Sequence, residues 1–256
     1  MSRASVVPVS VEFGQSERFR YVLRLADTSL ILGQRLGEWV GHAPALEEDL
    51  GVANISLDLI GQARLLLSYA GEIEAAGRDE DQLAYLRDQN DFCNLALVEQ
   101  PNGDFGCTIV RQVLIDVWQL ELLSWFDAST DQRLREIAAK AVKETRYHLR
   151  YSSGWLVRLG DGTEESHTRV QTSLNDLWKF TTELFTPDEI DRLAENAGVV
   201  QPAQTYYPHH QSPYDTYCDS CSPSRRHPRR KAFVIRMVSD APSFHQGSEG
   251  QKARYQ

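Results

Sequence analysis

Residues 21–65 read YVLRLADTSLILGQRLGEWVGHAPALEEDLGVANISLDLIGQARL. Apolar residues recur every three or four positions through residues 21–40 and again from residue 46 onward, which is the spacing of amphipathic helices. Gly41 and the Ala43–Pro44 step interrupt the pattern, as expected where a helix ends and the chain turns. The stretch therefore predicts an antiparallel hairpin of two long helices, with its turn between His42 and Ala43.

A second hairpin is predicted further along the chain. Helical periodicity covers about residues 105–128 and 131–159, with a turn near Thr130. Runs of alternating Val, Ile or Thr, typical of strands, are not found. Two hairpins joined by one long crossover are the ferritin-like arrangement, so the predicted fold class is an all-α, ferritin-like four-helix bundle with extra helices. The other expected helices are a weaker one at residues 79–98 in the crossover, one at 164–184, and a short one capped by Thr186 with Pro187 at its first position.

Four acidic residues sit at matching depths in these two hairpins. Asp27 and Asp58 are each about 15 residues from the first turn, or roughly 22–23 Å along a helix. Asp116 and Glu144 are each about 14 residues from the second turn, so they too are level with each other. All four fall on the apolar stripe of their helices, where an isolated carboxylate is expensive to bury. The pattern therefore requires partners, either metal ions or basic and hydrogen-bonding side chains.

The residues next to these acids argue against a di-metal centre. Ferritin-like di-metal proteins use a carboxylate from each of two helices and a Glu-x-x-His motif from each of the other two. The position three after Asp58 is Gly61, and the position three after Glu144 is Tyr147, so neither motif has its imidazole. We interpret the set as a degenerate di-metal position without metal or catalytic residues. His148, four residues after Glu144, leaves two interpretations open: a hydrogen-bonded buried pair or one weakly bound metal ion. Arg64, Lys143 and Arg146 are near enough in sequence to these acids to compensate their charge.

Composition narrows the classes of function. The net charge of −9 argues against nucleic acid as the main partner. No uncharged apolar run approaches the roughly 18 residues that span a bilayer, and the N-terminal apolar stretch is too short for a secretory signal. Four cysteines in 256 residues are too few for a disulfide scaffold. We therefore expect a cytoplasmic protein that does not enter the membrane.

The composition changes abruptly near residue 200. Residues 201–256 hold eight of the 27 Lys/Arg and four of the 36 Asp/Glu, a net charge of +4. The same segment has six of the ten prolines and, apart from a short strand or helix at residues 232–238, shows no helical or strand period. Such composition buries too little apolar surface to offset the entropy of ordering the chain. The predicted organisation is a leader at residues 1–17, a ferritin-like domain at 18–200, and a mostly disordered tail at 201–256.

Several stretches of the chain resemble one known family. They read LILGQRLGEWVGHAP at residues 30–44, NISLDLIGQA at 54–63, VEQPNG at 98–103, KAVKETRYHL at 140–149, GWLVRLGDG at 154–162 and LWKFTTELFTPDEI at 177–190. On these residues the chain resembles the C subunit of bacterial phenylacetyl-CoA 1,2-epoxidase, also called ring 1,2-phenylacetyl-CoA oxygenase. The combination of motifs is specific.

The resemblance implies a role inside a larger oxygenase. In this family an A subunit of similar fold carries a di-iron site, and the C subunit lacks the metal ligands and serves the A subunit as a scaffold. The assembly epoxidises the ring of phenylacetyl-CoA with O2 in aerobic phenylacetate degradation. It takes electrons from NADPH through a reductase with flavin and an iron–sulfur cluster. The expectation is a structural subunit without its own cofactor, whose partners are the A subunit and the other oxygenase subunits.

Two other functions stay open, and the tail departs from the family. The chain could be a catalytic ferritin-like metal oxygenase in its own right, or a stand-alone helical interaction protein. Members of the family continue past the DEI motif at residues 188–190 with further helices, which the Pro-, His- and Arg-rich tail does not offer. We expect the residues from about 201 to be a frameshift product, which resequencing of the locus would test.

Overall fold

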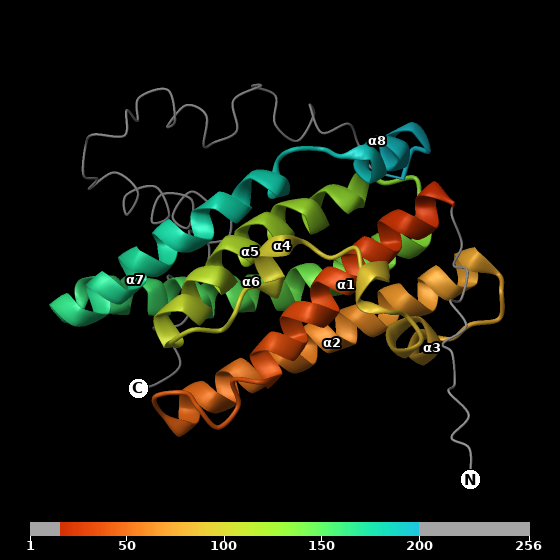
Figure 1. The fold of residues 1–256 in the computed structure, drawn as a ribbon. Helices are drawn as coiled ribbons and strands as arrows, with labels where there is room; N and C mark the ends of the chain where they lie inside the picture. The colour runs from red at the N-terminus through yellow and green to blue at the C-terminus, as the bar shows by residue number, and fades with distance from the viewer. Residues whose placement is uncertain (1–15, 200–256) are drawn as a thin grey trace, which may run out of the picture.

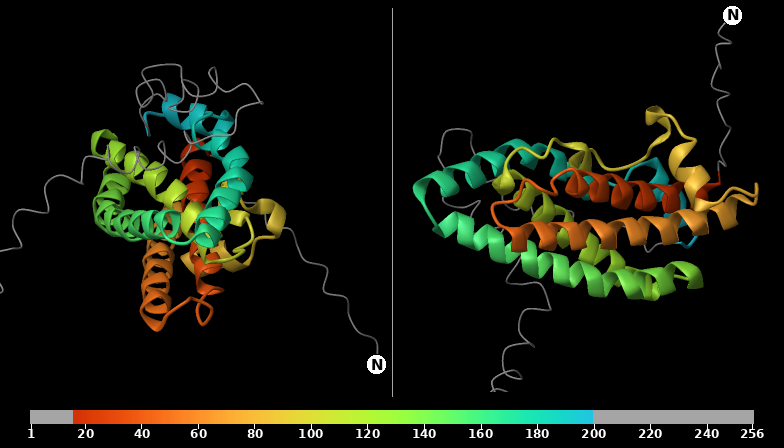
Figure 2. Two further views of the ribbon diagram at one scale, coloured as in Figure 1. Left: turned by 90° about the vertical axis from the view of Figure 1, so that its left-hand side faces the viewer. Right: turned by 90° about the horizontal axis from the view of Figure 1, so that it is seen from below.

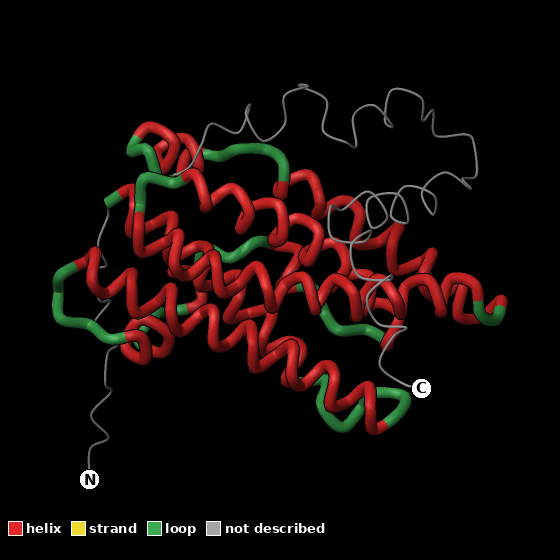
Figure 3. The backbone as a smooth tube through the Cα atoms, turned by 180° about the vertical axis from the view of Figure 1, so that it is seen from behind, coloured by secondary structure: helices red, strands yellow, loops and turns green. Residues whose placement is uncertain are grey.

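The computed structural model describes residues 16–199 of the chain. Within that range every regular element is a helix (Figure 3), which confirms the all-α prediction. The predictions made for the tail at 201–256, including its disorder and its frameshift origin, concern residues outside the described range. The same holds for all but the last two residues of the predicted leader.

Four long helices form the bundle as two antiparallel hairpins (Figure 1). α1 (Glu17–Gly37) pairs with α2 (Leu46–Glu74), and α5 (Phe105–Trp125) pairs with α6 (Gln132–Asp161). The chain between the hairpins returns along the length of the bundle, so that α5 runs in the same direction as α2. Two hairpins joined by one crossover are the ferritin-like topology, as predicted.

The crossover is not the single helix predicted at residues 79–98. It contains three short pieces, α3 (Glu80–Tyr85), the 3-10 turn η1 (Gln89–Asp91) and α4 (Ala96–Glu99). Asp88 begins η1 with a capping box, in which its side chain and the side chain three residues on satisfy each other's backbone N–H groups. The polar stretch around it has no apolar stripe to continue a helix, and this is why the helical prediction is wrong there.

The two C-terminal helices pack on different parts of the bundle. α7 (Glu164–Leu177) packs beside α5 and α6 and continues as the 3-10 segment η3 (Trp178–Leu184). α8 (Glu189–Asn196) packs against α1. Its cap is Asp188, whose carboxylate accepts the backbone N–H three residues on, and not Thr186 as predicted. The helix therefore starts two residues later than expected, because Asp is the stronger cap in this position.

The interior of the bundle has two apolar clusters. Leu32, Ile55 and Leu59 belong to the cluster near the first hairpin turn, and Val22, Leu67 and Leu134 belong to the cluster at the opposite end. All six side chains are at most 3% exposed. On α1, α2 and α6 the predicted acidic residues lie near the boundary between the two clusters. The bundle thus carries a polar layer across the middle of an apolar core.

Helix α2 is long and apolar enough to cross a membrane by length and composition, alone among the helices of residues 16–199. Its environment argues for a different role. It packs along α1 (Figure 2), and Val52, Ile55 and Leu59 on its inner face belong to the core. The Ser56 hydroxyl donates to the Gly33 carbonyl at 2.7 Å, which joins the two helices at close range. α2 is therefore a core helix of the bundle.

Two glycines of α2 should respond to alanine with opposite signs. A Cβ at Gly71 would clash with the backbone carbonyl oxygen of Arg78, and only a backbone shift can relieve that clash. A Cβ at Gly61 meets no atom within 4 Å. We expect Gly71→Ala to lower the free energy of unfolding by about 2 kcal/mol, and Gly61→Ala to raise it by about 0.5–1 kcal/mol through helix propensity. Urea unfolding of both variants checks this, and equal effects would contradict the helix-end geometry.

Candidate functional site

The four acids predicted from the sequence occupy the polar layer with unequal burial. The side chains of Asp27 and Asp116 are fully buried. The Asp58 side chain is 38% exposed and that of Glu144 is 20% exposed. Each of the four has hydrogen-bonding or charged protein partners, and these partners decide what the layer can do.

Asp27 on α1 is bound by the crossover. The guanidinium of Arg87 donates to its two carboxylate oxygens at 2.7 and 2.5 Å, and both side chains are fully buried. The backbone N–H of Cys93 donates to the same carboxylate at 3.0 Å. Burial raises the pKa of Asp27, and the Arg87 and Cys93 contacts oppose that shift. Both oxygens of Asp27 are thus committed to the segment that covers α1. Nothing in the sequence of the crossover singled out Arg87 for this role.

Asp58 on α2 pairs with His148 on α6. The distance from His148 Nε2 to Asp58 Oδ2 is 3.0 Å, and the His148 side chain is fully buried. The sequence placed His148 on the same face as Glu144, four residues away on its own helix. The structure instead directs the imidazole across the helix interface, so that the contact links the two hairpins of the bundle.

Glu144 on α6 belongs to a chain of amide hydrogen bonds. Gln62 Nε2 donates to Glu144 Oε2 at 3.0 Å, and Gln119 Nε2 donates to Gln62 Oε1 at 2.9 Å. Lys140, one turn earlier on α6, brings its ammonium to 3.6 Å from the other carboxylate oxygen. The chain connects α5, α2 and α6 at the level of the layer. Gln62 lies four residues after Asp58 on α2, a spacing from which the sequence could have identified it.

Asp116 on α5 is fully buried, as Asp27 is. Gln112 Nε2 donates to one of its oxygens at 2.7 Å, and Ser152 Oγ donates to the other at 2.7 Å. Burial raises the pKa of Asp116 to about 6, against the opposing effects of His148, Ser152 and Gln112. Gln112 lies one helical turn before Asp116, a spacing from which the sequence could have identified it.

Neither of the two positions where the di-metal motif has its imidazoles supplies one to the layer. Gly61 has none, and a Cβ built on it points into open space. Tyr147 is 42% exposed. The basic residues expected to compensate the acids lie elsewhere, since Arg64 pairs with Glu80 at 2.9 Å and Lys143 and Arg146 are exposed. Arg87 and Lys140 take that role instead.

The geometry does not fit a di-metal centre. In residues 16–199 no three side chains of His, Cys, Asp or Glu converge on a point where a metal ion could bind. A di-metal site needs carboxylate oxygens free to coordinate, yet those of Asp27 are bound by a guanidinium and those of Asp116 by two neutral donors. The arrangement can stabilise the bundle through its hydrogen bonds, and its carboxylates can bind protons.

The four-helix bundle with one crossover defines the chain as a ferritin-like helical protein. Within residues 16–199 its acidic layer is bound by protein side chains and offers no donor set for two metal ions. The chain belongs to the phenylacetic acid catabolic protein family, whose sequence model matches residues 10–221. It is 55% identical over 185 residues to the C subunit of 1,2-phenylacetyl-CoA epoxidase from Escherichia coli (strain K12). That alignment covers 72% of this chain and 74% of the relative.

Proposed function

We propose that this chain is the structural, non-catalytic subunit of a multicomponent oxygenase that epoxidises the ring of phenylacetyl-CoA in aerobic phenylacetate degradation. The similarity to the C subunit of 1,2-phenylacetyl-CoA epoxidase supports the proposal that this chain is part of such a complex and acts in phenylacetate degradation. One observation carries the non-catalytic role: the buried Asp27 binds Arg87 with both oxygens. Converting this layer to a metal site would require breaking a buried ion pair, which is strongly unfavourable.

The chemistry then belongs to a partner. We propose that the partner is the A subunit, which holds the di-iron centre, and that a reductase with NADPH, flavin and an iron–sulfur cluster supplies electrons. Phenylacetyl-CoA is bound by the complex. The ferritin-like domain at residues 18–200 is the part that assembles, in the cytoplasm. The degenerate layer at Asp27, Asp58, Asp116 and Glu144 serves to hold the bundle together.

An apolar stripe on α2 supports the assembly role. Leu46, Leu50 and Leu57 recur at helical spacing on the outer face of α2 and are 71%, 58% and 65% exposed. Ile60 on the same helix is also exposed. Soluble monomers rarely leave large apolar side chains exposed in a contiguous row, and such rows mark protein interfaces. We propose that this α2 stripe, defined by Leu46, Leu50, Leu57 and Ile60, binds the A subunit.

A charge placed on the α2 stripe should weaken the complex. Leu57→Asp puts a carboxylate where the interface would exclude water, so we expect the dissociation constant for the A subunit to rise by about tenfold or more. The variant should fold normally, because Leu57 contributes little to the core. Calorimetric titration of purified A subunit measures the effect.

Tyr85→Asp is the matched control, since Tyr85 is 77% exposed and lies on α3 beyond the end of α2. It should leave the dissociation constant unchanged. If Leu57→Asp binds the A subunit as tightly as Tyr85→Asp and the parent do, the α2 stripe is not the interface. The proposed complex would not be affected by that result.

Co-expression with the A subunit tests the function itself. A stable complex with iron and epoxidase activity confined to that partner is the expected result, with well under one iron per polypeptide in the isolated chain. Two irons per isolated chain would instead identify an oxygenase in its own right. Absence of both complex and iron would favour a stand-alone helical interaction protein.

A further inference from the structure

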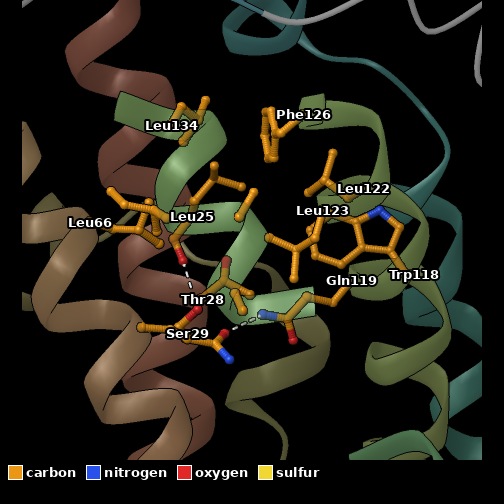
Figure 4. Close-up of a pocket in the computed structure, with 14 residues that line it drawn as sticks. Leu25, Thr28, Ser29, Leu66, Trp118, Gln119, Leu122, Leu123, Phe126 and Leu134 are labelled. Atoms are coloured by element: carbon orange, nitrogen blue, oxygen red, sulfur yellow. Dashed lines mark hydrogen bonds between the residues drawn. The ribbon is translucent and has the colours of Figure 1, made fainter. Parts of the chain in front are cut away.

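A mostly enclosed cavity lies inside the bundle, between α1, α2, α5 and α6 and next to the polar layer (Figure 4). Its wall is largely aliphatic and aromatic, with Leu25 from α1, Leu66 from α2, Leu123 from α5 and Leu134 from α6. Leu25, Leu66 and Leu134 are buried, whereas Leu123 is half-buried, so the approach from solvent is on the α5 side. None of the contacts described for the polar layer fills this space.

The polar side chains along the cavity wall are mostly engaged elsewhere. Ser29 Oγ donates to the Leu25 carbonyl at 3.1 Å, and Thr28 Oγ1 accepts the backbone N–H of Leu95 at 3.3 Å. Gln119 Nε2 donates to Gln62, which leaves only Gln119 Oε1 without a partner within residues 16–199 among the polar side-chain atoms of the wall. A buried water makes about three hydrogen bonds, and one acceptor does not hold it. The wall therefore favours an apolar occupant over water.

The size of the cavity limits that occupant. About 30 Å³ is open to the centre of a water-sized molecule, and one water needs roughly 10–15 Å³ on this measure. The space suits a molecule of two or so non-hydrogen atoms and is too small for an aromatic ring. We propose that this cavity binds a small apolar molecule of the size of dioxygen. The site does not depend on the proposed function, because it follows from the wall and the volume alone.

Xenon is the probe for this site, because it enters dry apolar cavities and has no polar interactions. The full-length chain, labelled at its Leu and Ile methyl groups, is titrated with xenon under pressure and followed by NMR. We expect saturable shifts at the methyls of Leu123, Leu134 and Ile137, and none at Leu32 and Leu36 in the other cluster. Dioxygen under pressure should broaden the same three sets of methyls. Small linear shifts at all methyls, without saturation, would overturn the proposal.

Filling the cavity should remove the response. Ala138→Val and Ala141→Val each add two methyl carbons to the wall and should abolish the saturable shifts. Ala70→Val is the matched control, since Ala70 is equally buried on α2 but does not line the cavity, and its variant should keep them. Shifts that persist in both filled variants would place xenon elsewhere and refute the site. If a filled variant does not fold, the pattern of shifts in the unsubstituted chain decides by itself.

Discussion

Replacing Arg87 with methionine should lower the free energy of unfolding by about 3–5 kcal/mol, the largest change expected from one substitution in the polar layer. The guanidinium of Arg87 and the carboxylate of Asp27 are both fully buried and bound through two hydrogen bonds. Methionine fills similar volume without charge, so it leaves the Asp27 carboxylate in the core with only the Cys93 amide as donor. Urea unfolding at neutral pH measures the loss.

An exposed ion pair supplies the control for Arg87. Arg64 donates to Glu80 at 2.9 Å and its side chain is 74% exposed, so Arg64→Met should change stability by no more than about 1 kcal/mol. The double variant Asp27→Leu with Arg87→Met removes both buried charges. It should be more stable than Arg87→Met alone, because the penalty arises from the unpaired charge. If Arg64→Met and Arg87→Met lower the free energy of unfolding by similar amounts, the buried ion pair stabilises the fold no more than the exposed one does.

Asp116→Asn should make the protein more stable at pH 8 by up to about 3 kcal/mol. Burial raises the pKa of Asp116 from 3.8 to about 6 in the folded state. Between these two values the folded chain keeps a proton that the unfolded chain has released. The contribution of Asp116 is therefore fully present below about pH 4 and is lost as the pH rises through 6. Asparagine carries no charge at any of these pH values, and its carbonyl can still accept from Gln112.

The pH dependence is what distinguishes this effect from simple repacking. Unfolding curves of the parent and of Asp116→Asn are recorded from pH 4 to pH 8. The free energy of unfolding of the variant should exceed that of the parent least at pH 4 and by a growing amount as the pH rises. Asp127→Asn makes the same chemical change at an exposed position and should stay within about 0.5 kcal/mol of the parent throughout. A gap between parent and Asp116→Asn that does not change with pH would refute the titration argument.

The polar layer suits a scaffold that must keep its shape beside a catalytic partner. His148 ties α2 to α6 through Asp58, and the Gln62–Gln119 bond ties α2 to α5. These hydrogen bonds across helices favour one packing of the bundle over its alternatives, because a shift of one helix would break them. The layer thus supports the proposed function through rigidity and not through chemistry.

The sequence determined the bundle and the absence of the di-metal motif. Apolar periodicity is a local property, so residues 21–40 and 46–75 predicted their hairpin, and Gly41 with Pro44 marked its turn. The Glu-x-x-His motifs are excluded because glycine and tyrosine stand at positions 61 and 147, where the motif has histidine. The cap of α8 was misplaced by two residues because Thr186 and Asp188 are both capping residues, and the stronger of the two, Asp188, takes the position.

Only the tertiary structure decided what holds the acids. Arg87 is 60 residues from Asp27 along the chain, and His148 is 90 residues from Asp58. Pairs so far apart leave no periodic signal, because they depend on how the crossover folds over α1 and how the two hairpins dock. The broken crossover, predicted as one helix, is a different case, since the polar stretch around Asp88 has no apolar stripe to continue a helix. The sequence thus specified which acids need partners, and the packing of distant segments supplied Arg87, His148 and Ser152.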